Sequence, residues 1–255
     1  MCLGHGNSSI FLENYTFSDT TYIIDLSNDF RLRKDAKFNG REFIYGLPEI
    51  NRNVIKKAKS IANPGCFATA IQLALLPLAK ENKLNSTIHI NATTGSTGAG
   101  VQNSSTSHFS WRNNNLSWYK PFTHQHLGEI KETLNKIQGK DTDVLFLPQR
   151  GDFTRGIFVS AYTLFDGNLK DALKLYEDFY KEEPFTQVSK NEVHLKLVIN
   201  SNQCFLHLHK HKDQLLITSI IDNLIKGASG QAIQNLNLMI GWEEKLGLQL
   251  KTSIF

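Results

Sequence analysis

Apolar residues recur with the spacing of an α-helix in four segments of the chain. The clearest segment begins at Cys66 and continues to about Lys80, and Pro77 near its end predicts a kink. The other three segments run from Leu127 to Ile137, from Leu169 to Tyr180 and from Ser229 to Trp242. Because each has an apolar face at helical spacing, we predict four helices.

Shorter apolar runs, bounded by turn-forming residues, predict β-strands. They lie at 21–26, 87–92, 144–147, 156–164, 194–200, 203–209 and 215–221. Residues 93–100 are rich in glycine, serine and threonine, and residues 101–123 are polar and aromatic, so both segments are predicted as loops. Helices and strands alternate early in the chain, whereas strands cluster later. This order predicts an α/β fold with a mixed-sheet domain.

The first six residues, Met1 to Gly6, have the pattern of a buried strand that ends in a glycine turn. The apolar run at 21–26 would then be the second strand of the chain. Since a domain rarely begins on the last residues of a core strand, we expect an earlier part of the fold to be missing from this sequence.

Composition narrows the class of protein. The chain has 255 residues, of which 40% are hydrophobic, and this is enough for a sizeable core. Its 28 lysines and arginines exceed its 24 acidic residues only slightly and form no dense basic run. The charge pattern therefore argues against nucleic-acid binding, and it suits a site for phosphorylated small molecules.

The three cysteines, Cys2, Cys66 and Cys204, are widely spaced. An odd number at these distances predicts neither a disulfide framework nor a zinc site, which fits a reducing cytosol. No apolar run approaches the roughly 18 residues of a membrane span, and no signal peptide opens the sequence. We therefore expect a cytoplasmic protein.

The segment around Cys66 is the most informative for chemistry. Asn63, Pro64 and Gly65 form a turn signal, so the cysteine would stand at the first residue of a helix. Free amides and the positive end of the helix stabilise a thiolate and lower the pKa of the thiol. Such a thiolate can attack a carbonyl carbon. The alternative is a buried and inert cysteine at a helix start.

A thiolate nucleophile needs a proton acceptor, and His124 and His126 are the best candidates. They stand two residues apart, just before a predicted helix, and Glu129 could orient one of the imidazoles. Alternatively, the two histidines belong to a solvated loop. A metal site has no third ligand at a supporting spacing.

Three further features carry weaker signals. The loop 93–100 could approach a phosphate through its glycines, or it could be a flexible turn. Arg155 stands just before a predicted strand and could clamp a carboxylate, or it could be an ordinary surface residue. His207, His209 and His211 alternate along a strand and share one face, which we interpret as an exposed face rather than a metal site.

Eight segments together resemble the N-acetyl-gamma-glutamyl-phosphate reductases, a family within the semialdehyde-dehydrogenase superfamily. They are GHG at 4–6, IDLSNDFRL at 24–32, YGLPE at 45–49, NPGCFAT at 63–69, TTGSTGAG at 93–100, HQHLGEI at 124–130, TRG at 154–156 and DNLIKGASGQAIQNLNLMIGWEEKLGL at 222–248. These segments follow the family order across almost the whole chain. The resemblance to aspartate-semialdehyde dehydrogenases is less close, particularly at 45–49 and 124–130.

The resemblance implies a reaction and a site. The family reduces an N-acyl-gamma-glutamyl phosphate to the semialdehyde with NADPH, in arginine biosynthesis, through a thioester on the cysteine that matches Cys66. Its acid/base histidine matches His124 or His126, and we favour His124. Arg155 would contact the substrate. The cofactor would lie beside Gly98, Ala99, Gly100, Asn223, Gly227 and Ala228.

The resemblance also implies an architecture: a truncated Rossmann-like parallel sheet and an α+β catalytic domain with a mixed sheet. Residues 1–65 would be the remainder of the dinucleotide-binding domain, 66–221 the catalytic domain, and 222–255 a helical segment that returns to the first domain. A small-molecule substrate and a homo-oligomer are expected, without nucleic-acid or membrane partners. Whether the acyl group is acetyl or succinyl stays open.

The sequence departs from the family in lacking the glycine-rich turn that holds the NADP pyrophosphate. An alternative function is therefore a catalytically impaired, N-terminally truncated homologue that cannot bind NADP. A second alternative is a hydrolase or acyltransferase that uses the same cysteine and histidine without a hydride. The segment 222–248 argues against it, because in the family this segment serves the dinucleotide site.

Overall fold

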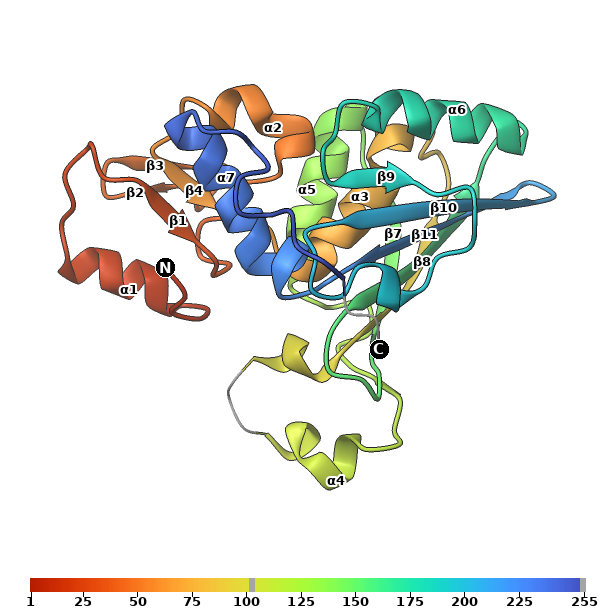
Figure 1. Ribbon diagram of the computed structural model, residues 1–255, viewed down its shortest axis with the longest axis horizontal. Helices are drawn as coiled ribbons and strands as arrows, with labels where there is room; N and C mark the ends of the chain where they lie inside the picture. Colours follow the sequence, from red (N-terminus) through yellow and green to blue (C-terminus); the bar gives the residue numbers. More distant parts are fainter. Residues whose placement is uncertain (101–103, 253–255) are drawn as a thin grey trace.

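Two β-sheets, lying side by side and covered by helices, organise the chain (Figure 1). The computed structural model describes residues 1–100 and 104–252. The first sheet has four strands and the second has seven. This arrangement confirms the predicted fold class, a Rossmann-like sheet beside a mixed-sheet α+β part.

The first sheet is largely parallel. Its strands, in spatial order, are β1 (Ile23–Asp25), β4 (Ser60–Ala62), β3 (Arg41–Tyr45) and β2 (Lys37–Phe38). β4 runs parallel to both neighbours, and β2 and β3 form an antiparallel hairpin. Met1 lies extended beside β1, where it bonds to the backbones of Ile24 and Leu26. The predicted strand end at 1–6 is thus reduced to Met1, and α1 (Asn7–Asn14) follows without having been predicted.

The C-terminal helix packs against this first sheet. α7 (Gly230–Ile240) lies beside α2 (Pro48–Ile55), and its Leu238 and Met239 share an apolar cluster with Ile61 of β4. Segments almost 180 residues apart therefore build one core. This packing supports a division of the chain into three parts, with boundaries after residues 65 and 221, and the division stays a proposal. Residues 253–255, at the end of the third part, lie outside the described residues.

The second sheet is mixed. Its order is β6 (Ser117–Trp118), β7 (Val144–Arg150), β5 (Ile88–Thr94), β8 (Ile157–Leu164), β11 (Gln214–Ile221), β10 (Cys204–His211) and β9 (Thr186–Val188). Five of these strands, β5, β7, β8, β10 and β11, confirm the predicted ones. β5 and β7 are parallel, whereas β5, β8, β11 and β10 follow one another antiparallel.

Three helices cover one face of this sheet: α3 (Cys66–Lys80), α5 (His126–Gln138) and α6 (Leu169–Tyr180) (Figure 1). All three were predicted. α3 is buried along nearly its whole length, because it is enclosed by the sheet, α5, α6 and the segment before α7. The opposite face of the sheet leaves Leu145, Tyr162 and Leu164 at least one-third exposed.

Two segments differ from the expected pattern. The predicted strand 194–200 is wrong, because Leu195 and Ile199 both pack on Gly156, four residues apart, and the segment forms the short turn η3 (Leu195–Leu197). The predicted loop 101–123, outside the undescribed 101–103, contains η2 (Ser105–Ser107), α4 (Phe109–Arg112) and β6, and it projects from the body as an arm.

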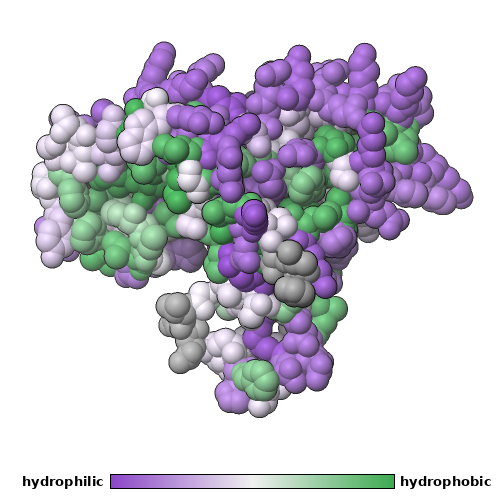
Figure 2. All heavy atoms as spheres, in the orientation of Figure 1, coloured by the Kyte–Doolittle hydropathy of each residue, from purple (hydrophilic) through white to green (hydrophobic). Residues whose placement is uncertain are grey.

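The surface is uneven in polarity. In Figure 2, apolar surface gathers around α1 and β1, whereas hydrophilic side chains cover the outer border along α2 and α6. Exposed apolar side chains of the first region include Leu3, Ile10, Tyr15 and Tyr22. In the described parts of the chain, every helix is too short or too polar to cross a membrane.

Candidate active site

Cys66 is the first residue of α3 and follows a parallel strand through a tight turn. β4 ends at Ala62, and Gly65 caps the helix with an extended backbone (φ −68°, ψ 150°). The turn therefore aims the cysteine past the carboxyl end of the sheet, where ligands of open α/β folds bind. The predicted position of this residue at a helix start is confirmed.

The thiol is more enclosed than the sequence predicted. Cys66 is half-buried, and a Cβ on Gly227 would fall only 2.8 Å from its Cβ. Burial raises the pKa of the thiol to about 11, although the backbone amides of Phe67 and Cys66 itself pull it down. The expected lowering of the thiol pKa is therefore wrong: the desolvation penalty exceeds the stabilisation by the helix end. A proton acceptor is needed to form the thiolate.

Glu129 of α5 holds the turn in front of the cysteine. Its Oε2 accepts a hydrogen bond from the Gly65 amide (3.1 Å) and another from the Tyr45 hydroxyl (2.7 Å). Its Oε1 forms an ion pair with Arg31 at 3.1 Å, and both side chains are almost fully buried. A buried carboxylate with this many donors is well ordered. It therefore fixes the backbone next to the nucleophile.

Arg31 extends this network to the strands. Its Nε donates to the Asn63 carbonyl (2.8 Å) and its Nη2 to the Leu26 carbonyl (2.9 Å). Asn63 in turn donates to the Ala228 carbonyl at 3.1 Å. The turn before Cys66 is thus connected to the first sheet, to α5 and to the segment that precedes α7.

Both histidines of the pair lie in the site rather than in a solvated loop. Only 4% of His124 and 6% of His126 is exposed, and their ring centroids are 4.6 Å apart. A Cβ on Gly65 would fall 2.4 Å from Nε2 of His126, so only glycine leaves room for this ring beside the cysteine turn. The structure therefore places His126 directly against the residue before Cys66.

The hydrogen bonds of the two rings differ. Nδ1 of His124 accepts from the His126 amide (3.2 Å), so a neutral His124 carries its proton on Nε2. Nε2 of His126 faces Oε1 of Glu129 at 3.9 Å, and its Nδ1 is buried without a partner in the described structure. His126 thus has a free ring nitrogen, whereas His124 offers a donor.

Burial keeps both imidazoles neutral. Desolvation lowers the pKa of His124 to about 4, and the nearby charges of Lys120 and Arg150 add to this effect. Desolvation, followed by the charge of Arg31, lowers the pKa of His126 well below its usual value. Because a base must be unprotonated to act, both rings are in the form that accepts a proton at neutral pH.

The candidate cofactor residues converge on the same edge. Asn223 accepts from the Gly156 amide (2.7 Å) and donates to Thr97 of the glycine loop at 3.0 Å. Gly98 and Ala99 belong to the short turn η1 (Ser96–Ala99). Gly227 contacts Cys66, and Ala228 bonds to the cysteine turn. The loop 93–100 and the segment after 222, far apart in sequence, therefore lie side by side.

Two glycine turns, at Gly6 and Gly100, have a left-handed backbone conformation. Gly6 and Gly100 both have positive φ angles (79° and 73°), and a Cβ on either would meet no atom within 4 Å. The conformation of both glycines is one that other residues rarely adopt.

Arg155 lies in the same region but is already paired. Its Nη2 contacts Asp222 at 2.9 Å and its Nη1 contacts Asn200 at 2.6 Å. His209 and His211 are exposed and His207 is half-buried, in line with an exposed strand face. Among the residues described, no three His, Cys, Asp or Glu side chains gather closely enough to hold a metal ion.

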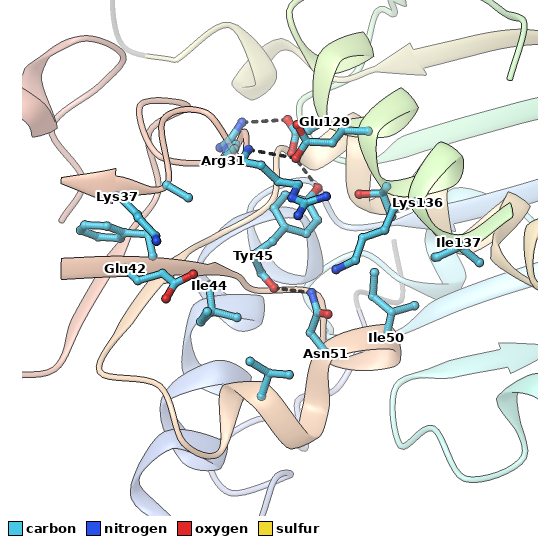
Figure 3. Close-up of a pocket in the computed structure, with 16 residues that line it drawn as sticks. Arg31, Lys37, Glu42, Ile44, Tyr45, Ile50, Asn51, Glu129, Lys136 and Ile137 are labelled. Atoms are coloured by element: carbon cyan, nitrogen blue, oxygen red, sulfur yellow. Dashed lines mark hydrogen bonds and ion pairs between the residues drawn. The ribbon is translucent and has the colours of Figure 1, made fainter. Parts of the chain in front are cut away.

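A cavity of about 490 Å³ lies behind the cysteine turn, between β3, α2 and α5. Arg31, Tyr45 and Glu129 close one end of it, and Lys37 and Lys136 line its sides (Figure 3). The sequence reasoning did not single out Arg31 and Tyr45. Both belong to segments that carry the family resemblance, 24–32 and 45–49, which was the available signal.

Two family models match the chain. Residues 66–223 match the semialdehyde dehydrogenase dimerisation domain, and residues 1–58 match the semialdehyde dehydrogenase NAD binding domain. A curated protein of Flavobacterium johnsoniae named N-acetyl-gamma-glutamyl-phosphate reductase is 62% identical over all of this chain and 79% of its own length. The chain belongs to the N-acetyl-gamma-glutamyl-phosphate reductase family. The family resemblance in the sequence is thus confirmed.

Other relatives agree with this assignment. A reductase of the same name from Christiangramia forsetii is 56% identical over all of this chain and 78% of its own length. Among solved structures, aspartate semialdehyde dehydrogenase II from Vibrio cholerae superposes with a TM-score of 0.70 at 15% identity, over 93% of this chain and 78% of that one. This second likeness establishes the fold. The NAD binding domain match supports a nicotinamide cofactor for this reductase family member.

Proposed function

We propose that this chain reduces N-acetyl-gamma-glutamyl phosphate to the semialdehyde with NADPH, in arginine biosynthesis, through a thioester on Cys66. One observation carries the proposal: Cys66 starts a helix, while His126, Glu129 and Gly227 pack around its turn. A nucleophile, a base and a group that orients the base thus stand together. The names of the relatives supply the substrate and the type of reaction, a reduction.

The first step is attack by the sulfur of Cys66 on the acyl carbon. The thiol has a pKa of about 11, so it must lose its proton as it attacks. Nδ1 of His126 is the free ring nitrogen that accepts this proton, and Glu129 beside Nε2 stabilises the imidazolium that forms. We therefore assign the base to His126, whereas the sequence resemblance favoured His124.

Release of phosphate completes the acyl transfer. The tetrahedral intermediate collapses, the bond between acyl carbon and phosphate oxygen breaks, and the thioester remains on Cys66. The amides of Cys66 and Phe67, which already act on the sulfur, stabilise the developing oxyanion. The departing phosphate takes the proton that His126 holds, and Nε2 of His124 donates a hydrogen bond to it.

When bound, a nicotinamide cofactor would supply the hydride that reduces the thioester on Cys66. The residues that would hold it are Gly98, Ala99, Gly100, Asn223, Gly227 and Ala228. The thiohemiacetal anion then expels the sulfur, the aldehyde leaves, and the thiolate takes a proton from solvent through His126. Close packing of Gly227 on Cys66 limits access of water to the thioester, which would otherwise hydrolyse.

The choice of NADP over NAD, a cytoplasmic location and a homo-oligomer are parts of the same proposal. The open face of the second sheet, with Leu145, Tyr162 and Leu164 exposed, belongs to the segment that matches a dimerisation domain. An apolar sheet face of this kind is a typical subunit interface. A second copy of the chain is therefore the expected partner.

The function is tested in the reverse direction, because the semialdehyde is easier to handle than the acyl phosphate. The chain is mixed with N-acetylglutamate semialdehyde, inorganic phosphate and NADP, and absorbance at the nicotinamide band is recorded. We expect phosphate-dependent reduction of NADP and a lower rate with NAD. Oxidation that does not require phosphate, or hydrolysis of the acyl phosphate without any nicotinamide, would contradict the proposal.

A further inference from the structure

Two arginines that the proposed mechanism does not use meet beside the active site. Arg112 ends α4 in the projecting arm, and Arg150 ends β7. Neither forms a salt bridge within the described part of the chain. Two nearby guanidinium groups that form no ion pair repel each other, so the fold maintains an unfavourable arrangement here.

Arg112 is covered although it lacks an adequate partner. Only 9% of the residue is exposed, its Nη2 makes one long hydrogen bond to the Gly151 carbonyl (3.4 Å), and its buried Nη1 has no acceptor among the described residues. Burial, and then the charge of Arg150, lower the pKa of this guanidinium. A buried hydrogen-bond donor without an acceptor destabilises the fold, and a bound anion would remove this cost by accepting the hydrogen bond.

Arg150 is held in a fixed orientation. Its guanidinium carbon lies 4.1 Å from the centroid of the Tyr119 ring, and Nη1 donates to the Thr106 hydroxyl at 2.9 Å. Stacking on an aromatic ring leaves the edge of the planar fork free for a bidentate ligand. The charge of Asp152 raises the pKa of Arg112 but is the smallest of the influences on it, and this carboxylate already accepts a hydrogen bond from the Asn114 amide (2.8 Å).

The pair borders the catalytic groups through Tyr119. The Tyr119 ring packs edge-on against His124, with centroids 5.6 Å apart. Burial, and next the nearby Cys66, raise the pKa of the Tyr119 hydroxyl. The charge of Arg150 also lowers the pKa of His124. Arg150 is thus separated from His124 by one aromatic ring, and Arg112 is hydrogen-bonded to the residue that follows Arg150.

We propose that Arg112 and Arg150 bind a carboxylate of the substrate. The inference rests on the proposed function, whose substrate is an N-acylated glutamyl derivative with a carboxylate that stays on the molecule through every step. Two forked cations match a planar carboxylate. Arg155, the arginine that the sequence suggested for this role, is already paired with Asp222, so it is less available.

The test uses the reverse reaction, in which the semialdehyde and phosphate are separate substrates. In Arg150→Met we expect the KM for the semialdehyde to rise at least tenfold, while the KM for phosphate and for NADP stay within twofold of wild type. Arg150→Lys should recover only part of the loss, because it keeps the charge without the fork. Lys140→Met, an exposed cation remote from the site, is the control.

The acyl group identifies which carboxylate is bound. If the arginines hold the α-carboxylate, the KM values of N-acetyl and N-succinyl semialdehydes rise by the same factor in Arg150→Met. If they hold a carboxylate on the acyl group, wild type prefers the succinyl compound and the variant loses that preference. Either result supports the proposal. An unchanged KM for both semialdehydes, or a raised KM for phosphate alone, overturns it.

A binding measurement separates this proposal from the function itself. In a Cys2→Ser background, N-acetylglutamate and N-succinylglutamate should slow the alkylation of Cys66 by iodoacetamide. In Arg150→Met, the same degree of protection should need at least a tenfold higher concentration of whichever compound protects the wild type. Equal protection of both proteins overturns the carboxylate site. If the wild-type chain oxidises no semialdehyde, but its Cys66 is protected and Arg150→Met weakens that protection, only the proposed reaction is contradicted.

Discussion

The turn that carries Cys66 and the strand that carries Cys204 differ in surroundings more than in burial. Burial raises the pKa of both thiols, to about 11 at Cys66 and about 12 at Cys204. Cys204 is fully buried in β10, where its sulfur lies 3.6 Å from the Ser219 hydroxyl. Cys66 keeps contact with solvent and has the His126–Glu129 pair beside its turn.

The comparison teaches that the pKa of a resting thiol does not identify a nucleophile. Both sulfurs are protonated at neutral pH, but only the one at residue 66 lies beside a neutral imidazole and at the open edge of a parallel sheet. A base that removes the proton during attack makes a permanently ionised thiolate unnecessary. The four predictions below test this contrast, beginning with the largest effect.

Replacing the two sulfurs should separate their roles completely. Cys66→Ser is expected to lower kcat on the order of 10⁴-fold or more, because the nucleophile is lost. Cys204→Ala should leave kcat within twofold and reduce the free energy of unfolding by about 1–2 kcal/mol through the small cavity it creates. Steady-state kinetics and urea unfolding measure both. An inactive but folded Cys204→Ala would abolish the contrast.

The two histidines should also differ in effect. His126→Gln removes the proton acceptor, and we expect kcat to fall by about 10²–10⁴-fold. His124→Gln keeps a donor near the position of Nε2, so a fall of about tenfold or less is expected. The measurement is kcat for each variant at pH 7.5, with circular dichroism to verify folding. If His124→Gln proves the more damaging change, the assignment of the base is reversed.

Glu129→Gln should weaken both the site and the fold. The substitution leaves Arg31 buried without its counter-charge, which costs about 3–5 kcal/mol, and it removes the carboxylate that stabilises a protonated His126. We expect a fall in kcat of about 10–100-fold with little change in KM. Glu132→Gln is the matched control on the same helix: Glu132 lies about one turn after Glu129 and accepts a hydrogen bond from the Arg33 amide.

The pH dependence of alkylation gives the most direct readout of the resting thiol. In a Cys2→Ser background, the rate at which iodoacetamide modifies Cys66 should rise about tenfold per pH unit between pH 7 and 10, because the thiolate fraction does so below a pKa of about 11. An ordinary thiol, with a pKa of about 8.5, would level off within this range. A plateau below pH 9 is incompatible with a buried thiol at residue 66.

Local patterns predicted the elements that build the centre of the second sheet. The periodicity after Cys66 and the apolar runs of β5, β8, β10 and β11 each carry their signal within one segment. The segment 194–200 was wrongly predicted as a strand, because its spacing of apolar residues also suits a turn in which Leu195 and Ile199 pack on Gly156. Short strands such as β4, with three residues, are too brief for a period to be recognised.

The site residues could be predicted only where they stand close together in the sequence. Cys66 and the His124–His126 pair stand in short motifs, and the structure brings them together. The ion pair between Arg31 and Glu129 joins residues 98 positions apart, and no local pattern indicates such a contact. Burial of the cysteine by Gly227 likewise depends on a distant segment, which is why the direction of its pKa shift was predicted wrongly.

The contact of Gly227 with Cys66 has a consequence for how the enzyme is made. Translation proceeds from the N-terminus, so the segment 223–228 leaves the ribosome after all the other groups of the site. A nascent chain can form β4, α3 and α5 while one side of its sulfur is still open to water. Enclosure of the thiol, and with it the protection of a thioester, arrives only after this segment has been made.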